Sequence, residues 1–170
     1  TRTYKFDKKA ITDQNTTINT KYDIVSCQFT LHYFFVNDNT LDTVVGKISK
    51  ALKPGGYFIG TTLLGSKVKE MIINNKFKDK VKIEKIDEYS YKMKLFDTAQ
   101  IYDKDLKEYF VNFEKFKQVC KTYGLELAEA KEFEDIYKFY KKNSSNKKFL
   151  MKDYELAISS LNTTFVFQKT

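Results

Sequence analysis

Apolar residues recur with two periods along the chain, and the change between these periods predicts an α/β fold. The run at 22–29 (YDIVSCQF) begins as a buried strand. A helical stripe follows between Leu41 and Leu52, after N-cap candidates at 37–40. Lys53-Pro54-Gly55-Gly56 closes that helix, and the run at 57–62 (YFIGTT) predicts another strand. A strand–helix–strand unit of this length implies parallel strands and a right-handed crossover.

The rest of the chain predicts further elements of both kinds. Alternation at 81–86 and 89–96 favours half-exposed antiparallel strands, and strands are also expected at 4–6, from 125 and at 164–167. Helices are expected from Ser66 as a cap, over 113–123 until Gly124, over 133–140 and over 149–161. Polar stretches at 13–17 and 143–146 predict loops. We find no repeat and no long linker, so we expect a single domain over residues 1–170.

Composition excludes several classes of protein. The chain has 170 residues, of which 42% are hydrophobic and 16% aromatic, which is too apolar for a disordered chain. No apolar run approaches the roughly 18 residues that would span a bilayer, so we expect no membrane partner. The two cysteines, Cys27 and Cys120, form no C-x-x-C pair, and we expect both to be reduced thiols in the core.

The net charge of +8 leaves two interpretations open. A basic surface fits a polyanionic partner such as RNA. Lysines spread over the surface also fit a merely solvated exterior, and the sequence alone does not separate these interpretations.

Polar residues stand where the first predicted strand ends. Gln28, His32 and Tyr33 follow its apolar run, and ligands of such sheets bind at the carboxyl ends of the strands. The order Gln-Phe-x-x-His-Tyr, followed after the helix by Pro-Gly-Gly-Tyr-Phe-Ile-Gly-Thr-Thr, closely resembles the mRNA cap (guanine-N7) methyltransferases of eukaryotes and large DNA viruses. The resemblance covers most of residues 22–170 and is sharpest in 22–62.

The resemblance implies S-adenosylmethionine as the cofactor. In the family, the matching glutamine and tyrosine help to bind it, which assigns Gln28 and Tyr33 here, and Asp13 matches an aspartate that faces the adenine of the cofactor. An amide can bond polar edges of the cofactor, and an aromatic ring beside a sulfonium gains cation–π attraction. No metal is implied.

The resemblance also implies a pocket for the cap guanine. The family's histidine at the strand end lies against that base, and this position is His32. A glutamate before an aromatic-apolar run bonds the N1 and N2 edge of guanine, and Glu108 in LKEYFVNF matches it. A tyrosine of the closing strand contacts the cap in the family. Here Asn162 takes its place, which can hydrogen-bond but cannot stack in the same way.

The fold implied is the C-terminal part of a Rossmann-like S-adenosylmethionine-dependent methyltransferase, α/β in class, with an added antiparallel β region. The glycine-rich loop that grips the cofactor has no match in this sequence and should precede Thr1. We therefore expect a partial domain that is inactive alone. Its partners would be capped RNA and the missing N-terminal part, within a parent capping polypeptide. Guanine N7 has no proton to lose, so no residue is assigned as a chemical catalyst.

Two other functions stay open at this point. One is a methyltransferase of the same fold that acts on another small molecule, and the other is a non-catalytic RNA-binding or stimulatory subunit. The expected location is intracellular, in the cytoplasm for a cytoplasmic DNA virus and in the nucleus for a cellular protein.

Overall fold

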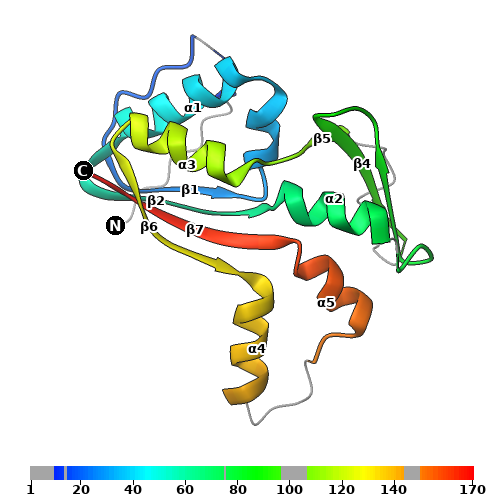
Figure 1. The fold of residues 1–170 in the computed structure, drawn as a ribbon. Coiled ribbons are helices and arrows are strands. Elements are labelled where there is room, and N and C mark those ends of the chain that lie inside the picture. Colours follow the sequence, from blue (N-terminus) through cyan, green and yellow to red (C-terminus); the bar gives the residue numbers. More distant parts are fainter. Residues whose placement is uncertain (1–9, 14, 75, 97–106, 144–149) are drawn as a thin grey trace, which may run out of the picture.

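A computed structural model of the protein describes residues 10–13, 15–74, 76–96, 107–143 and 150–170. Its main sheet has four strands in the order β1-β2-β7-β6, with bounds Tyr22–Gln28, Leu52–Leu63, Asn162–Lys169 and Leu125–Glu132. β1 and β2 are parallel, as predicted, whereas β7 runs antiparallel to both of its neighbours, β2 and β6. The carboxyl ends of β1, β2 and β6 and the start of β7 therefore share one end of the sheet (Figure 1).

Helices α1 (Asp38–Ala51) and α3 (Phe113–Thr122) cover one face of this sheet (Figure 1). Each begins at an asparagine whose side chain accepts a backbone N–H: Asn37 from Thr40 at 2.8 Å and Asn112 from Lys115 at 3.0 Å. Such caps satisfy backbone donors that the first helical turn leaves unpaired. Gly124, with φ of 69°, lies in the left-handed region just after α3 and lets the chain turn into β6.

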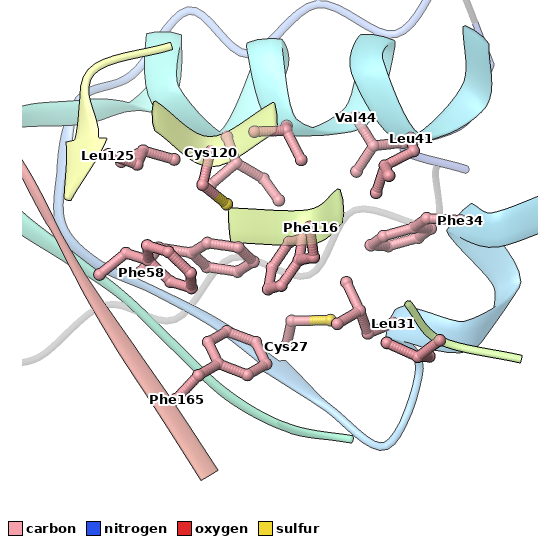
Figure 2. Packing of buried hydrophobic residues seen from close by; sticks show 14 of the residues in the cluster. Cys27, Leu31, Phe34, Leu41, Val44, Phe58, Phe116, Cys120, Leu125 and Phe165 are labelled. Atoms are coloured by element: carbon pink, nitrogen blue, oxygen red, sulfur yellow. The ribbon is translucent and has the colours of Figure 1, made fainter. Parts of the chain in front are cut away.

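Aromatic residues fill the space between the sheet and these helices. Figure 2 shows Phe58 of β2, Phe116 of α3 and Phe165 of β7 in contact, with centroids 5.2–6.1 Å apart and edge-on orientations. Cys27 and Cys120 lie in the same cluster as free, buried thiols, as predicted. Buried edge-to-face rings contribute about 0.5–1.5 kcal/mol per pair beyond area burial, so this cluster anchors the sheet that carries the site.

Close packing explains why β2 has a glycine, Gly60, in its middle. A Cβ atom there would lie 2.2 Å from the backbone oxygen of Cys27 and 2.4 Å from the ring of Phe165. No real side chain tolerates these distances, so Gly60 allows β1 and the Phe165 ring to approach β2 closely.

A second sheet lies beyond this end of the main sheet. It has three antiparallel strands in the order β3-β4-β5, with bounds Val81–Lys85, Ser90–Leu95 and Lys107–Tyr109. Helix α2 (Gly65–Asn74) follows β2 and lies beside this sheet (Figure 1). A 3-10 helix, η1 (Leu31–Val36), follows β1, and α4 (Phe133–Asn143) and α5 (Asp153–Ser159) connect β6 to β7.

Several predicted boundaries were wrong. Leu52 already pairs with Tyr22, so β2 starts there, and 53–56 bulge out before Tyr57 pairs with Ile24. Helix α2 begins at Gly65, which places Ser66 inside its first turn rather than at a cap. Helix α5 is shorter than the predicted 149–161, of which residue 149 lies outside the described residues, and the backbone N–H of Lys152 bonds Glu155 where its first turn starts.

Other predicted elements shift at their ends. β7 begins two residues earlier than predicted, at Asn162. β5 is a strand where none was predicted. The strand predicted at 4–6 lies outside the described residues, as does most of the loop predicted at 143–146.

Candidate functional site

The end of β1 is held in an unusual backbone conformation. Phe29 has a φ of 53°, in the left-handed region that non-glycine residues rarely adopt. Its N–H donates to the backbone oxygen of Thr61 at 3.0 Å and to the Thr61 hydroxyl oxygen at 3.2 Å. The Thr61 hydroxyl donates in turn to Oε1 of Gln28 at 2.8 Å. Strain of this kind persists where the surrounding structure fixes it, and it is common at functional sites.

Gln28 is positioned by one residue of its own strand and one residue of β2. Besides accepting from Thr61, its Nε2 donates to the Ser26 hydroxyl at 2.9 Å. The amide is thus oriented, with one N–H and one oxygen lone pair left over. It lies at the carboxyl end of β1, as the sequence predicted.

The 3-10 helix η1 turns the next two side chains toward a hollow. With three residues per turn, Leu31 and Phe34 share one side and are buried in the core. His32 and Tyr33 lie on the remaining sides, with ring centroids 4.0 Å apart. His32 is 6% exposed and Tyr33 is 42% exposed. The histidine therefore forms an inner wall and the tyrosine lies at the mouth.

Glu108 reaches the same hollow from the second sheet. It lies directly opposite Tyr91 across β5 and β4, so both side chains project from one face of that sheet. The Tyr91 hydroxyl donates to Oε2 of Glu108 at 2.8 Å. Met93 and Leu95, two and four residues beyond Tyr91 on β4, line the hollow beside Glu108.

Asn162 reaches the same hollow from the main sheet. It is the first residue of β7 and lies opposite Leu63, the last residue of β2. Its Nδ2 donates to the backbone oxygen of Ser159 at 3.1 Å. Its Oδ1 is buried without a hydrogen-bond partner in the part of the chain that the structure describes, and the same holds for Nε2 of His32.

The cavity formed in this way has a volume of about 350 Å³. This falls in the range of roughly 300–1,000 Å³ that is usual for small-molecule sites. Its lining residues come from five separate segments of the chain: Phe29, Thr30, His32, Tyr33, Leu63, Met93, Leu95, Glu108 and Asn162. An apolar wall with a few convergent polar atoms is typical of a small-molecule binding site.

Burial controls the charges in the cavity. Burial lowers the pKa of His32 from 6.5 to about 4, so its imidazole is neutral at neutral pH. Burial also raises the pKa of Glu108, and the hydrogen bond from Tyr91 opposes that rise. The pKa of Tyr91 is raised by its own burial and by the charge of Glu108, so its hydroxyl stays a donor.

Four of the six predicted site residues line this cavity: His32, Tyr33, Glu108 and Asn162. Gln28 lies next to it, because Phe29 and its hydrogen-bond partner Thr61 hold the strand end there. Asp13 is elsewhere: its carboxylate accepts from Asn15 N–H at 2.9 Å, and its backbone oxygen is bound by Lys47 of α1. Asp13 does not line the cavity.

Three residues of the site were not singled out from the sequence. Thr61 was visible within the quoted Gly-Thr-Thr motif, although the two hydrogen bonds of its hydroxyl were not foreseeable. Phe29 has no sequence signal for its backbone conformation. Tyr91 was one of several alternating apolar residues, and nothing in that pattern indicated its hydroxyl contact.

Metal-binding clusters and membrane-spanning helices are absent from the described residues. No cluster of three or more His, Cys, Asp or Glu side chains there could hold a metal ion. Within the same ranges, no helix combines the length and apolar character that crossing a bilayer requires.

Comparison with known proteins gives a consistent family signal. A family model described as the mRNA (guanine-N(7))-methyltransferase domain matches residues 4–166. The mRNA cap guanine-N(7) methyltransferase of Meyerozyma guilliermondii is 32% identical over 132 residues, which are 68% of this chain and 23% of that protein. The probable mRNA-capping enzyme of Acanthamoeba polyphaga mimivirus is 29% identical over 150 residues, 73% of this chain and 12% of that protein. The chain thus spans less than a third of the length of these relatives.

Solved structures agree on the fold. An S-adenosylmethionine-dependent methyltransferase from Clostridium acetobutylicum superposes with a TM-score of 0.59 at 18% identity, over 95% of this chain and 63% of that one. A similar protein from Listeria monocytogenes gives a TM-score of 0.57 at 16% identity, over 96% and 68%. The predicted fold class, an α/β methyltransferase fold with an additional antiparallel sheet, is therefore confirmed.

Proposed function

This chain belongs to the mRNA (guanine-N(7))-methyltransferase domain family, and we propose that it forms the cap-binding part of an enzyme that methylates N7 of the cap guanine. The methyl donor would be S-adenosylmethionine, in keeping with the methyltransferase fold. The acceptor would be capped mRNA. The chain would then be one part of a larger methyltransferase domain within a capping protein.

The observation that carries this proposal is the polar lining of the cavity. Glu108 offers a carboxylate, and Asn162 offers a buried carbonyl oxygen that has no partner among the described residues. Guanine has N–H donors at N1 and N2, which need acceptors of this kind. A neutral His32 has an unused Nε2, which in its protonated tautomer would donate to an acceptor such as O6. Buried polar atoms seldom stay unpaired, so their convergence here supports a polar planar ligand.

The charges of the cavity also suit the reaction. When bound, S-adenosylmethionine supplies a methyl group on a positively charged sulfur. Guanine N7 would take that methyl as its bond to sulfur breaks, with neutral S-adenosylhomocysteine as the leaving group, and the base would become cationic because N7 has no proton to lose. A carboxylate at Glu108 stabilises that positive charge, and its hydrogen bonds to N1–H and N2–H strengthen as these donors become more acidic. His32, neutral because of burial, adds no opposing charge.

The residues at the end of β1 fit one side of the cofactor. The oriented amide of Gln28 has a second N–H with no hydrogen-bond partner among the described residues, which could bond a polar group. The ring of Tyr33 lies 42% exposed at the mouth of the cavity, and an aromatic ring at that place would attract a cationic sulfur. Asp13 lies against α1 and contacts none of these residues, so we leave it out of the proposed cofactor site.

RNA beyond the cap would be held mainly by charge. The sequence carries 30 basic and 22 acidic side chains, and phosphate contacts need no reading of the bases. We further propose an intracellular site of action, since mRNA caps are made and methylated inside cells.

The test is methyl transfer by the full-length protein from radiolabelled S-adenosylmethionine to RNA capped with guanine, RNA capped with adenine and uncapped RNA. The proposal requires label at guanine N7 of the first RNA alone, and no turnover by residues 1–170 on their own. Transfer to a small molecule with no preference for capped RNA would favour another methyltransferase of this fold. RNA binding without any transfer would favour a non-catalytic subunit.

A further inference from the structure

Tyr91 lies behind the cavity rather than in it. Its side chain is fully buried, and its ring packs against Phe110 with centroids 4.8 Å apart. Val68 of α2 and Leu161 complete a small apolar cluster around it. A tyrosine hydroxyl in such surroundings needs a partner, and it finds one by donating to Oε2 of Glu108 at 2.8 Å.

We propose that Tyr91 is a positioning residue that makes the cavity selective for guanine by holding Glu108 as a carboxylate acceptor. This inference rests on the proposed function. Tyr91 touches neither base nor cofactor, and it acts through Glu108. Its hydroxyl fixes one oxygen of a carboxylate that lines the cavity, and a donor at this distance favours the ionised form of the acid.

The protonation state of Glu108 decides which base fits. An ionised carboxylate presents only acceptors, which match the two donors at N1 and N2 of guanine. A protonated carboxyl presents one donor and one acceptor. That pair matches adenine, which has an acceptor at N1 and a donor amine at C6. Loss of the Tyr91 hydroxyl would therefore relax the choice between the two purines.

No positive charge reaches Glu108 from His32, Asn162 or Lys107. From η1 come His32 and Tyr33, the first neutral because burial lowers its pKa to about 4. From β7 comes the uncharged Asn162. Its neighbour on β5, Lys107, forms an ion pair with Asp87 instead, at 3.3 Å. Burial raises the pKa of Glu108, and the hydrogen bond from Tyr91 lowers it.

The test compares Tyr91→Phe with Tyr123→Phe in the full-length protein. Tyr123 is a matched control because its hydroxyl also donates to a carboxylate, that of Asp42 at 2.6 Å, on a surface away from the cavity. The kcat/KM for guanine-capped and adenine-capped RNA is measured between pH 5.5 and 8.5. For Tyr91→Phe we expect the acid limb of the guanine-cap profile to move to higher pH. The preference for guanine should fall roughly 2- to 10-fold at pH 6, which is the effect expected from the loss of one hydrogen bond. The preference should recover at high pH.

A second substitution keeps the aromatic ring and its hydroxyl. Replacing Tyr91 by 3-fluorotyrosine makes the hydroxyl a stronger donor, so the acid limb should move to lower pH. This arm decides the matter if Tyr91→Phe does not fold. The proposal is overturned if the profile with 3-fluorotyrosine does not move, or if a folded Tyr91→Phe loses activity equally at every pH or matches Tyr123→Phe. If the wild-type protein has no guanine preference at all, the proposed function itself fails, which is a different result.

Discussion

Replacing Glu108 by Gln should remove guanine recognition with little change in shape. The two side chains have almost the same size, but an amide has one acceptor and two N–H donors where the carboxylate has only acceptors. The Tyr91 hydroxyl, 2.8 Å from Oε2, needs an acceptor because Tyr91 is fully buried. It would take the amide oxygen, and the amide N–H groups would then face the cavity.

The cost follows from that orientation. Guanine donors would meet an amide donor, so at least one N–H of the base would lie unpaired in a dry site. A buried unpaired donor costs about 1–3 kcal/mol. This corresponds to a loss of roughly 5- to 150-fold in kcat/KM for guanine-capped RNA. The opposite amide orientation would leave the Tyr91 proton unpaired instead, at a similar cost.

The assay is steady-state methyl transfer to guanine-capped RNA by full-length Glu108→Gln, alongside calorimetric titration with S-adenosylhomocysteine. Glu114→Gln is the matched control. Glu114 lies on the surface of α3, pairs with Lys117 at 2.7 Å and has a side chain that is 76% exposed. We expect the loss only for Glu108→Gln, with normal binding of S-adenosylhomocysteine.

Two results would refute this reasoning. Full activity of Glu108→Gln with undiminished preference for guanine over adenine caps would show that Glu108 does not contact the base. An equal loss of cofactor affinity would show that the substitution disturbs the fold around β5 rather than the base contact.

Four further predictions follow from the same geometry. Gln28→Ala and Tyr33→Ala should each weaken S-adenosylhomocysteine binding by about 0.5–2 kcal/mol in calorimetry, while cap affinity changes less. Because burial lowers the pKa of His32 from 6.5 to about 4, the unfolded chain binds the extra proton first. Urea unfolding should show stability falling as pH drops from 6.5 to 4, by up to about 3 kcal/mol, and His32→Gln should reduce this loss. Gly60→Ala should lower the free energy of unfolding by about 1–3 kcal/mol or more, because its Cβ would meet the Cys27 oxygen; an unchanged urea midpoint would contradict the packing. Affinity for capped RNA should fall linearly on a log–log plot against salt, and a flat plot would mean that the lysines are only a solvated surface.

Local patterns were sufficient for most of the elements. The stripe between Leu41 and Leu52 gave α1, and Asn37, in the predicted N-cap stretch, accepts the Thr40 N–H. The Pro-Gly-Gly run does not itself end the helix: α1 stops at Ala51, and 53–56 form the bulge of β2. Element ends were less predictable. The start of β2 depends on pairing with Tyr22, which no local pattern encodes.

The residues proposed for the cofactor site also divide into those that the local sequence places and those that tertiary contacts place. Gln28 and Tyr33 follow a strand end, so their place at the carboxyl edge of the sheet was predictable from order along the chain. Asp13 was placed by a weak match alone, and its contacts with Asn15 and Lys47 put it against α1. A short polar loop has no periodic pattern that fixes its position, and tertiary contacts decide where it lies.

The sequence by itself determined the family, the parallel strand pair and the identity of the polar residues that line the cavity. Only the tertiary structure decided that Glu108, Asn162 and His32 meet. They lie on three different elements, and their meeting depends on an antiparallel β7 that starts beside the end of β2, and on β5 pairing with β4. The structure also set their charges. Burial keeps His32 neutral, and Tyr91, seventeen residues from Glu108 in sequence, donates to its carboxylate across two paired strands. Burial and cross-strand contact arise from non-local packing, so the residue order alone does not contain them in readable form.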